Sequence, residues 1–192
     1  MNRKSALTES GQLFEQVLKL HQELSHAIKT QFDRSLPLAD ELLDRWERAS
    51  LLGFGKGSSI YDSSYVFGKV VVGENTWIGP FTIIDGSGKL TIGNGCTISA
   101  GVQIYTHDNI SKTLTEGQTA IEVEPVIIGN FTYISPNVVI PKGITIGDHC
   151  LIATGSFVNK SIPSFSIAAG IPAKVIGKIK IENGKMIKVY SN

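Results

Sequence analysis

Four histidines stand among the side chains of this sequence that could do acid–base chemistry, and His107 has the most suggestive surroundings. It lies at the start of a polar, irregular run, YTHDNISKTLTEGQTAIEVEPV, that interrupts a regular apolar spacing. An imidazole with an unperturbed pKa near about 6.5 is mostly neutral at pH 7 and can accept a proton from a weakly acidic group. The residues alone leave two interpretations open: a general base, or a loop histidine that hydrogen-bonds the corner.

The cysteines and the other histidines indicate less chemistry. Cys96 and Cys150 are too few for a disulfide framework, and both fall on the small, inward position of the repeat described next. We interpret them as core residues, since free cysteine is among the most buried residue types. His21 and His26 lie on an expected helix, as ordinary surface residues, and His149 lies at a repeat corner. A metal site requires several ligands to converge, so we expect no metal.

Short strands at a six-residue spacing must position His107. Aliphatic residues recur at every sixth position over residues 60–84, resume after a two-residue slip over 92–104, and return over 128–158. The residue four positions after each aliphatic one is nearly always small or apolar, and it points to the same side of a strand. Glycine and asparagine between them tolerate the positive φ of tight corners. A fixed short period of this kind indicates a wound parallel β-sheet.

Different patterns flank the repeat. Residues from about 8 to 50 carry apolar side chains at helical spacing and predict two helices, the second starting near Pro37, packed as a hairpin or against something larger. Alternation around Asn183-Gly184 predicts a type I′ hairpin. We therefore expect a mainly β protein with an N-terminal helical segment (1–53), a parallel β-helix (54–178) with a loop insertion at 105–127, and a C-terminal hairpin tail (179–192).

The repeat segments GSGKLTIGNGCTISAGVQIYTHD and PVIIGNFTYISPNVVIPKGITIGDHCLIATGSFVNKSIP resemble the hexapeptide-repeat acyltransferases. Within that family they look most like the bacterial sugar O-acetyltransferases, which include enzymes that decorate lipopolysaccharide. The resemblance covers residues 53–178 and implies a left-handed parallel β-helix with three hexads per triangular coil. That hand opposes the usual right-handed crossover, so it comes from the resemblance alone. A homotrimer with CoA in a groove between adjacent subunits is also implied.

For His107 the resemblance favours catalysis. In that family the loop reaches toward a neighbouring subunit, and a histidine at its start is the general base. The implied reaction moves an acetyl group from acetyl-CoA to a hydroxyl of a sugar or glycan, and a positioned base typically contributes about 10²–10⁴-fold in rate. N-acetylation of an amino sugar and a non-catalytic β-helix scaffold are the alternatives. A metal-dependent hydratase is disfavoured, because its spaced histidine set is missing.

Three side chains are candidates for binding the acceptor. Asp108 follows His107 directly, but adjacent strand residues point to opposite faces, so we expect no direct pair unless the backbone turns there. Asp85 lies on the bulged corner that the two-residue slip predicts, where it could line a groove or simply be solvated. Trp77 faces outward in the expected register and could stack on a sugar or cover a neighbouring chain.

Five residues are candidates for binding the coenzyme, because the stretch after the last hexad resembles the segment that closes the last coil beside CoA. The small side chains of Ala153, Ala168 and Ala169 would let the pantetheine arm approach the backbone and pair with it. Lys160 and Lys174 suit the phosphates of CoA. The alternative for the two lysines is that they keep the end of the solenoid soluble.

Composition limits the remaining possibilities. The chain has 192 residues, enough for one sizeable core, and its 18 basic and 17 acidic residues give a formal net charge of +1. That balance indicates no nucleic-acid partner. No stretch approaches the roughly 20 apolar residues needed to cross a bilayer, and Met1–Gln12 has no apolar run of the signal-peptide kind. We expect a cytoplasmic protein.

Overall fold

A computed structural model of the chain describes residues 10–190. These residues form two compact units that divide after Asp44, and each unit is described by itself. The first contains α1 (Gly11–Phe32) and α2 (Leu38–Leu42), and the second begins with α3 (Arg45–Leu51) and continues through the strands. The division therefore lies before α3, whereas the sequence suggested a boundary at residue 53.

The helical unit differs from its prediction in one respect. Helix α1 ends where Asp33 adopts the left-handed conformation, with φ 51°. The single second helix expected after Pro37 is wrong, because Leu43 is extended (φ −114°, ψ 118°) and separates α2 from α3. Within the unit, the buried carboxylate of Glu41 on α2 bonds Nδ1 of His21 at 2.6 Å, so His21 is more than a surface residue.

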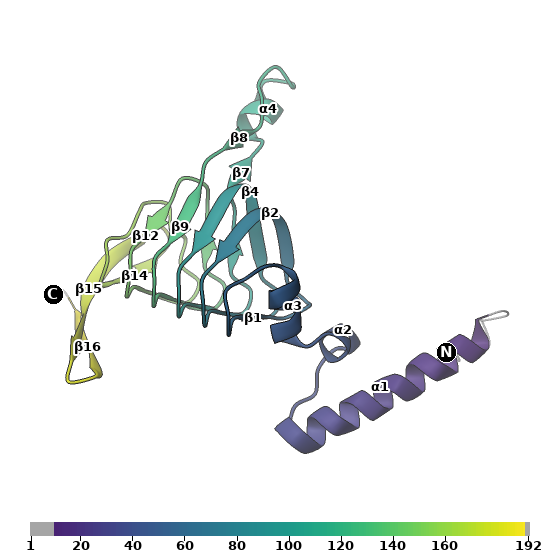
Figure 1. Ribbon diagram of the computed structural model, residues 1–192. Helices are drawn as coiled ribbons and strands as arrows, with labels where there is room; N and C mark the ends of the chain where they lie inside the picture. Colours follow the sequence, from purple (N-terminus) through teal and green to yellow (C-terminus); the bar gives the residue numbers. More distant parts are fainter. Residues whose placement is uncertain (1–9, 191–192) are drawn as a thin grey trace. The chain divides into compact units, whose positions relative to one another are not determined.

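The second unit is a parallel β-solenoid, drawn in Figure 1. Strands of successive coils pair in parallel at residues 18 apart, as Ser59 does with Trp77 and Tyr133 with Leu151. Three hexads therefore make one coil, and the predicted β-helix is confirmed. Its strands are β1 (Ser59–Ile60), β2 (Tyr65–Val72), β3 (Trp77–Ile78), β4 (Ile83–Ile92), β5 (Thr97–Ile98), β6 (Gln103–Ile104), β9 (Val126–Ile128), β10 (Tyr133–Ile134), β11 (Val139–Ile140), β12 (Thr145–Ile146), β13 (Leu151–Ile152) and β14 (Ser166–Gly170).

Stacked aliphatic side chains fill the solenoid. The inward positions of the hexads hold isoleucines that are almost fully buried: Ile60, Ile78, Ile84, Ile92, Ile98, Ile104, Ile128, Ile134, Ile140, Ile146 and Ile152. Both cysteines lie in the same core, as predicted, and burial raises the pKa of each thiol. A buried thiol with a raised pKa is a poor nucleophile, so the cysteines contribute packing.

The predicted two-residue slip is a bulge between β2 and β4. Phe67 pairs with Asp85 and Gly68 with Gly86, and the register then shifts so that Val70 pairs with Leu90. A Cβ atom on Gly86 would lie 2.4 Å from the carbonyl oxygen of Lys69, so glycine is required there. The bulge fixes the stretch that follows Asp85.

The insertion is more ordered than the sequence suggested. It contains β7 (His107–Asp108), the short helix α4 (Ile110–Leu114) and β8 (Glu122–Val123), and β7 pairs antiparallel with β8. In Figure 1 this hairpin projects from the solenoid, with β7, which begins at His107, at its base. Thr97 pairs with Tyr133, 36 residues later, so the solenoid resumes in register after the insertion.

An antiparallel hairpin follows the last coil. Strand β15 (Ala173–Glu182) pairs with β14 and with β16 (Lys185–Tyr190). Asn183 and Gly184 have φ 50° and 72°, the two positive values of the predicted type I′ turn. The hairpin thus continues one sheet of the solenoid and covers the edge of β14.

Candidate active site

His107 and Asp85 form a hydrogen-bonded pair. The Nδ1 atom of His107 lies 2.7 Å from Oδ2 of Asp85, which reaches it from β4, 22 residues earlier in the chain. The His107 side chain is 40% exposed, whereas that of Asp85 is 1% exposed. Asp85 is therefore the partner of the candidate base, and its predicted place as a lining of an open groove is wrong, because the carboxylate is buried.

Hydrogen bonds hold the Asp85 carboxylate in its ionised form. Burial by itself would raise its pKa, but hydrogen bonds from Ser87, Thr106 and His107 outweigh burial and keep the pKa well below the usual range. The Thr106 amide lies 2.7 Å from Oδ2, and the Ser87 hydroxyl lies 2.6 Å from Oδ1. An ionised carboxylate accepts and does not donate, so Nδ1 of His107 carries the proton in this pair.

This pairing leaves the other ring nitrogen free for chemistry. With the proton on Nδ1, the Nε2 atom of a neutral His107 carries a lone pair. A base held in one tautomer by a buried carboxylate is the arrangement that activates hydroxyl nucleophiles in many hydrolases and transferases. The geometry can therefore abstract a proton from an acceptor hydroxyl and stabilise the imidazolium that forms.

Asp108 takes part in a different cluster. Its Oδ2 atom lies 2.5 Å from Nζ of Lys142, which also lies 2.7 Å from Oε2 of Glu122. The hydrogen bond from Lys142 lowers the pKa of Asp108 and that of Glu122, and these bonds raise the pKa of Lys142. As expected, His107 finds its carboxylate partner elsewhere. Lys142 clamps β7 and β8 together at the base of the insertion.

Trp77 lies on another sheet from the His107–Asp85 pair. It belongs to β3 in the eight-stranded sheet, whereas Asp85 belongs to β4 in the six-stranded one. Its ring is partly buried and meets Tyr61 edge to face, with centroids 6.2 Å apart. The structure therefore does not bring Trp77 together with His107.

The candidate coenzyme residues gather only in part, at the last coil. Ala168 is fully buried, and its carbonyl accepts a hydrogen bond of 2.9 Å from the amide of Ala153. Ala169 pairs with Lys174 across β14 and β15. Strands β13 and β15 flank β14, so the backbone of Ala168 is paired on both sides. Lys160 and Lys174 are exposed.

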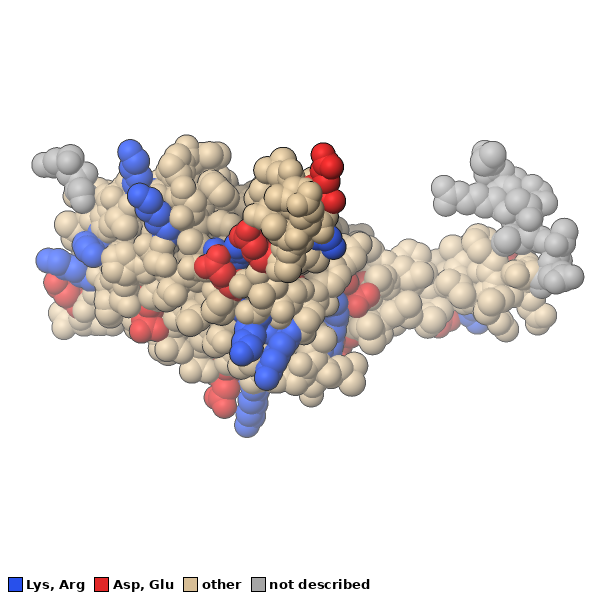
Figure 2. All heavy atoms as spheres, turned by 90° about the horizontal axis from the view of Figure 1, so that it is seen from above, with Lys and Arg blue, Asp and Glu red and all other residues tan. Residues whose placement is uncertain are grey.

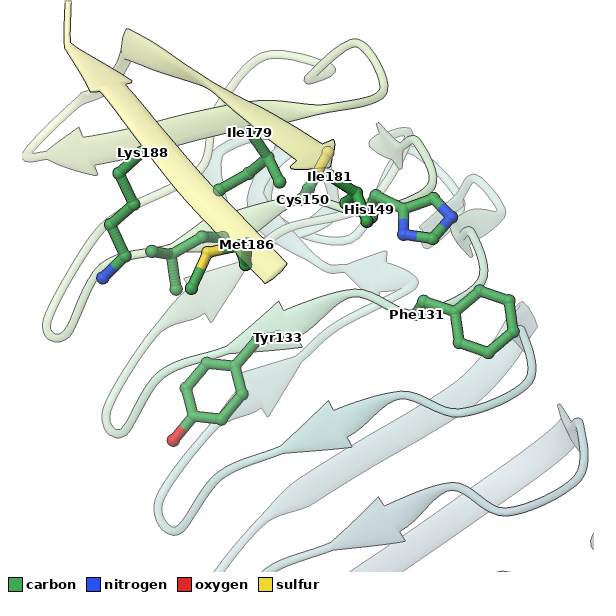
Figure 3. A pocket seen from close by; sticks show the side chains of 9 residues that line it. Phe131, Tyr133, His149, Cys150, Ile179, Ile181, Met186 and Lys188 are labelled. Carbon is green, nitrogen blue, oxygen red and sulfur yellow. The ribbon is translucent and has the colours of Figure 1, made fainter. Parts of the chain in front are cut away.

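A cavity of about 420 Å³, which the sequence did not indicate, lies between the C-terminal hairpin and strands β10 and β13, as Figure 3 shows. Its lining is mostly apolar and consists of Phe131, Tyr133, His149, Cys150, Leu151, Ile179, Ile181, Met186 and Lys188. The His149 ring stacks between those of Phe131 and Phe165, with centroids 5.2 and 4.8 Å away. This stacking accounts for His149 as a packing residue.

The surface carries both signs of charge. Figure 2 shows acidic and basic side chains interspersed over the face in view. Within residues 10–190, no three His, Cys, Asp or Glu side chains converge as a metal site would require. None of the helices described for the chain is long and apolar enough to span a bilayer.

Sequence reasoning found His107 but missed most of its surroundings. No motif marked Thr106 and Lys142, since each acts through a contact with a residue distant in sequence, and none marked Ser87, which bonds Asp85 two residues away. The one available signal was the slip in the hexad spacing, which marked the corner that contains Asp85.

Comparisons with known proteins agree with this fold. Residues 125–160 match the family described as bacterial transferase hexapeptide (six repeats). Galactoside O-acetyltransferase of Escherichia coli (strain K12) is 34% identical over an alignment of 128 residues that covers 56% of this chain and 63% of that protein. The match thus spans less than two thirds of that relative's length.

Two solved structures extend the likeness over most of the chain. A galactoside acetyltransferase in complex with coenzyme A has a TM-score of 0.64 and 27% identity, covering 96% of this chain and 92% of that one. A maltose O-acetyltransferase from Clostridium difficile 630 has a TM-score of 0.57 and 27% identity, covering 86% of each chain. The hexad repeat and the interrupted solenoid of this chain are thus similar to those of hexapeptide-repeat transferases.

Proposed function

We propose that this protein is an acyl-CoA-dependent acetyltransferase that moves the acetyl group of acetyl-CoA to a hydroxyl of a sugar or surface glycan. The observation that carries the proposal is the pair formed by His107 and the buried, ionised Asp85, which leaves Nε2 of His107 as an available base. Two of its relatives are named for acetylating a galactoside and maltose, which supports a sugar acceptor.

The reaction follows from the pair by ordinary acyl transfer. Nε2 of His107 takes the proton of the acceptor hydroxyl as its oxygen attacks the thioester carbonyl carbon. The tetrahedral intermediate collapses, the carbon–sulfur bond breaks, and the departing thiolate receives the proton from His107. Asp85 keeps Nδ1 protonated throughout and stabilises the imidazolium. A thiolate is a good leaving group, so no covalent enzyme intermediate is required.

The contacts to the two substrates belong to the same proposal. Lys160 and Lys174 are exposed cations suited to the phosphates of CoA, and Ala153 is half-buried. Asp108 and Trp77 are weaker candidates for the acceptor, because Asp108 is already paired with Lys142 and Trp77 lies on another sheet. We further propose a cytoplasmic homotrimer, whose subunits would frame the CoA groove.

The test is thiol release from acetyl-CoA by the purified protein with a panel of sugars and glycans. His107→Gln should reduce acceptor-dependent release by about 10²-fold or more while CoA binding persists, because only the base is lost. His26→Ala, on α1, is the matched histidine control and should keep full activity. No release with any acceptor, together with no CoA binding, would leave a non-catalytic scaffold. Release with amino sugars alone would favour N-acetylation.

A further inference from the structure

Two aromatic side chains stand exposed on one face of β2. Tyr65 and Phe67 are 64% and 47% exposed, and their rings stack with centroids 6.0 Å apart and an angle of 14° between their planes. Alternate residues of a strand point to the same side, so both rings rise from the outer surface of the sheet. Single exposed apolar residues are common, but an ordered aromatic pair is a local apolar surface that fits a ligand.

The aromatic pair of Tyr65 and Phe67 lies beside the candidate base, His107. Phe67 is the register partner of Asp85, one strand away, and neighbouring strands are about 4.8 Å apart. Asp85 in turn bonds His107. The next register pair is Gly68 with Gly86, so no side chain rises from that row. An acceptor lying on Phe67 would therefore be within reach of the imidazole.

The chemistry of an exposed aromatic surface selects one class of occupant. A pyranose ring carries hydroxyls around its rim and C–H groups on its faces. The negative face of an aromatic ring attracts such C–H groups, while the hydroxyls at the rim remain available to polar partners. Ligand sites commonly combine aromatic walls with a few convergent polar groups, and here those groups are His107 and the exposed Ser87. The thin pantetheine chain has no flat face to stack.

We propose that Tyr65 and Phe67 form the surface on which the pyranose ring of the acceptor stacks, and that this contact presents its hydroxyl to His107. This inference rests on the proposed function, because it assigns the acceptor side of the same site. Phe67 is the nearer residue and contributes most. Tyr65 supports the Phe67 ring and extends the surface for a longer glycan.

Kinetics test the proposal with the whole protein and whichever glycan supports thiol release. Phe67→Ala should raise the KM for the glycan about tenfold or more and leave the KM for acetyl-CoA within about twofold. Phe67→Tyr should retain the wild-type KM, because it keeps the ring. Val71→Ala, an exposed position farther along β2, is the matched control and should change neither constant. An unchanged glycan KM in Phe67→Ala would overturn the proposal.

A binding measurement separates this inference from the reaction itself. The measurement is saturation-transfer NMR with methyl β-D-galactopyranoside and methyl α-D-glucopyranoside. Saturation should pass from the aromatic protons of the wild type to the ring C–H protons of the glycosides, and this transfer should be lost in Phe67→Ala. Transfer without any thiol release would sink the acetyltransferase and keep the stacking surface. No saturation transfer to either glycoside would overturn the stacking surface. A change of oligomeric mass in Phe67→Ala would also overturn it, because it would mean that the rings pack against another copy of the chain.

Discussion

At the scale of single residues, the partner of His107 is set by the coil and not by sequence adjacency. Asp108 is the next residue, yet its carboxylate bonds Lys142, whereas Asp85, a coil away, bonds the imidazole. Parallel stacking brings residues about one coil apart into contact, so a β-solenoid builds catalytic pairs from positions that look unrelated in the chain. The buried carboxylate then fixes which nitrogen of His107 is basic.

Replacing the carboxylate with an amide tests that assignment. Asp85→Asn places an NH₂ group against Nδ1, which favours the tautomer with the proton on Nε2 and removes the basic lone pair from the acceptor side. We expect kcat to fall by about 10²–10⁴-fold with little change in the KM for acetyl-CoA. The ¹⁵N shifts of the His107 ring should report the change of tautomer directly.

A second outcome would contradict the assignment. Ser87→Ala removes a neighbouring hydrogen bond to the same carboxylate but leaves the carboxylate in place. If Asp85→Asn keeps its activity, as Ser87→Ala does, the His107–Asp85 pair has only a structural role. Equal unfolding temperatures of the two variants would show that such a comparison is not distorted by misfolding.

At the scale of elements, local patterns were predictable and long-range closures were not. The hexads and the Asn183-Gly184 turn follow from the spacing and conformational freedom of neighbouring residues, and both are confirmed. The insertion was predicted as an irregular loop, because its β7–β8 pairing joins short segments without periodicity. The break at Leu43 was missed because the apolar spacing continues through it, so the pattern alone does not end the helix.

The clamp at Lys142 is expected to order the stem that carries His107. Lys142→Met removes the charge shared by Asp108 and Glu122, leaving two carboxylates that repel each other across β7 and β8. We expect faster amide hydrogen exchange in residues 105–126, a kcat several-fold lower, and little change in the rest of the solenoid. Lys142→Arg should restore most of the loss.

The same clamp gives a pH dependence with a definite sign. Asp108 and Glu122 have pKa values lowered by Lys142, so their contribution is fully present above the unfolded values near about 3.9 and 4.3. It is lost as the pH falls through the lower, folded values. Amide hydrogen exchange in residues 105–126 should therefore be as fast in the wild type as in Lys142→Met only in acid. Identical exchange rates in the two proteins at pH 7 would contradict the clamp.

At the scale of the whole solenoid, stability depends on how the ends of the coil stack are closed. Each coil buries its isoleucines against its neighbours, so the last coil leaves a strand edge that must be covered. Strand β15 pairs along β14, and the hairpin carries Ile179 against the core end, where its amide donates to the carbonyl of Phe165 at 2.8 Å. The mostly apolar cavity beneath the hairpin lies at this end of the solenoid.

A charge placed under the hairpin should detach it. Ile179 is buried, so Ile179→Asp puts an unpaired carboxylate in an apolar contact, a change that costs several kcal/mol. We expect a lower unfolding temperature by about 5 °C or more and light scattering that grows with concentration, because the exposed edge of β14 can pair with other chains. Lys180→Asp introduces the same side chain at the next, exposed position and is the matched control. If both variants unfold at the same temperature as the wild type, the hairpin does not close the solenoid and the coils stabilise themselves without it.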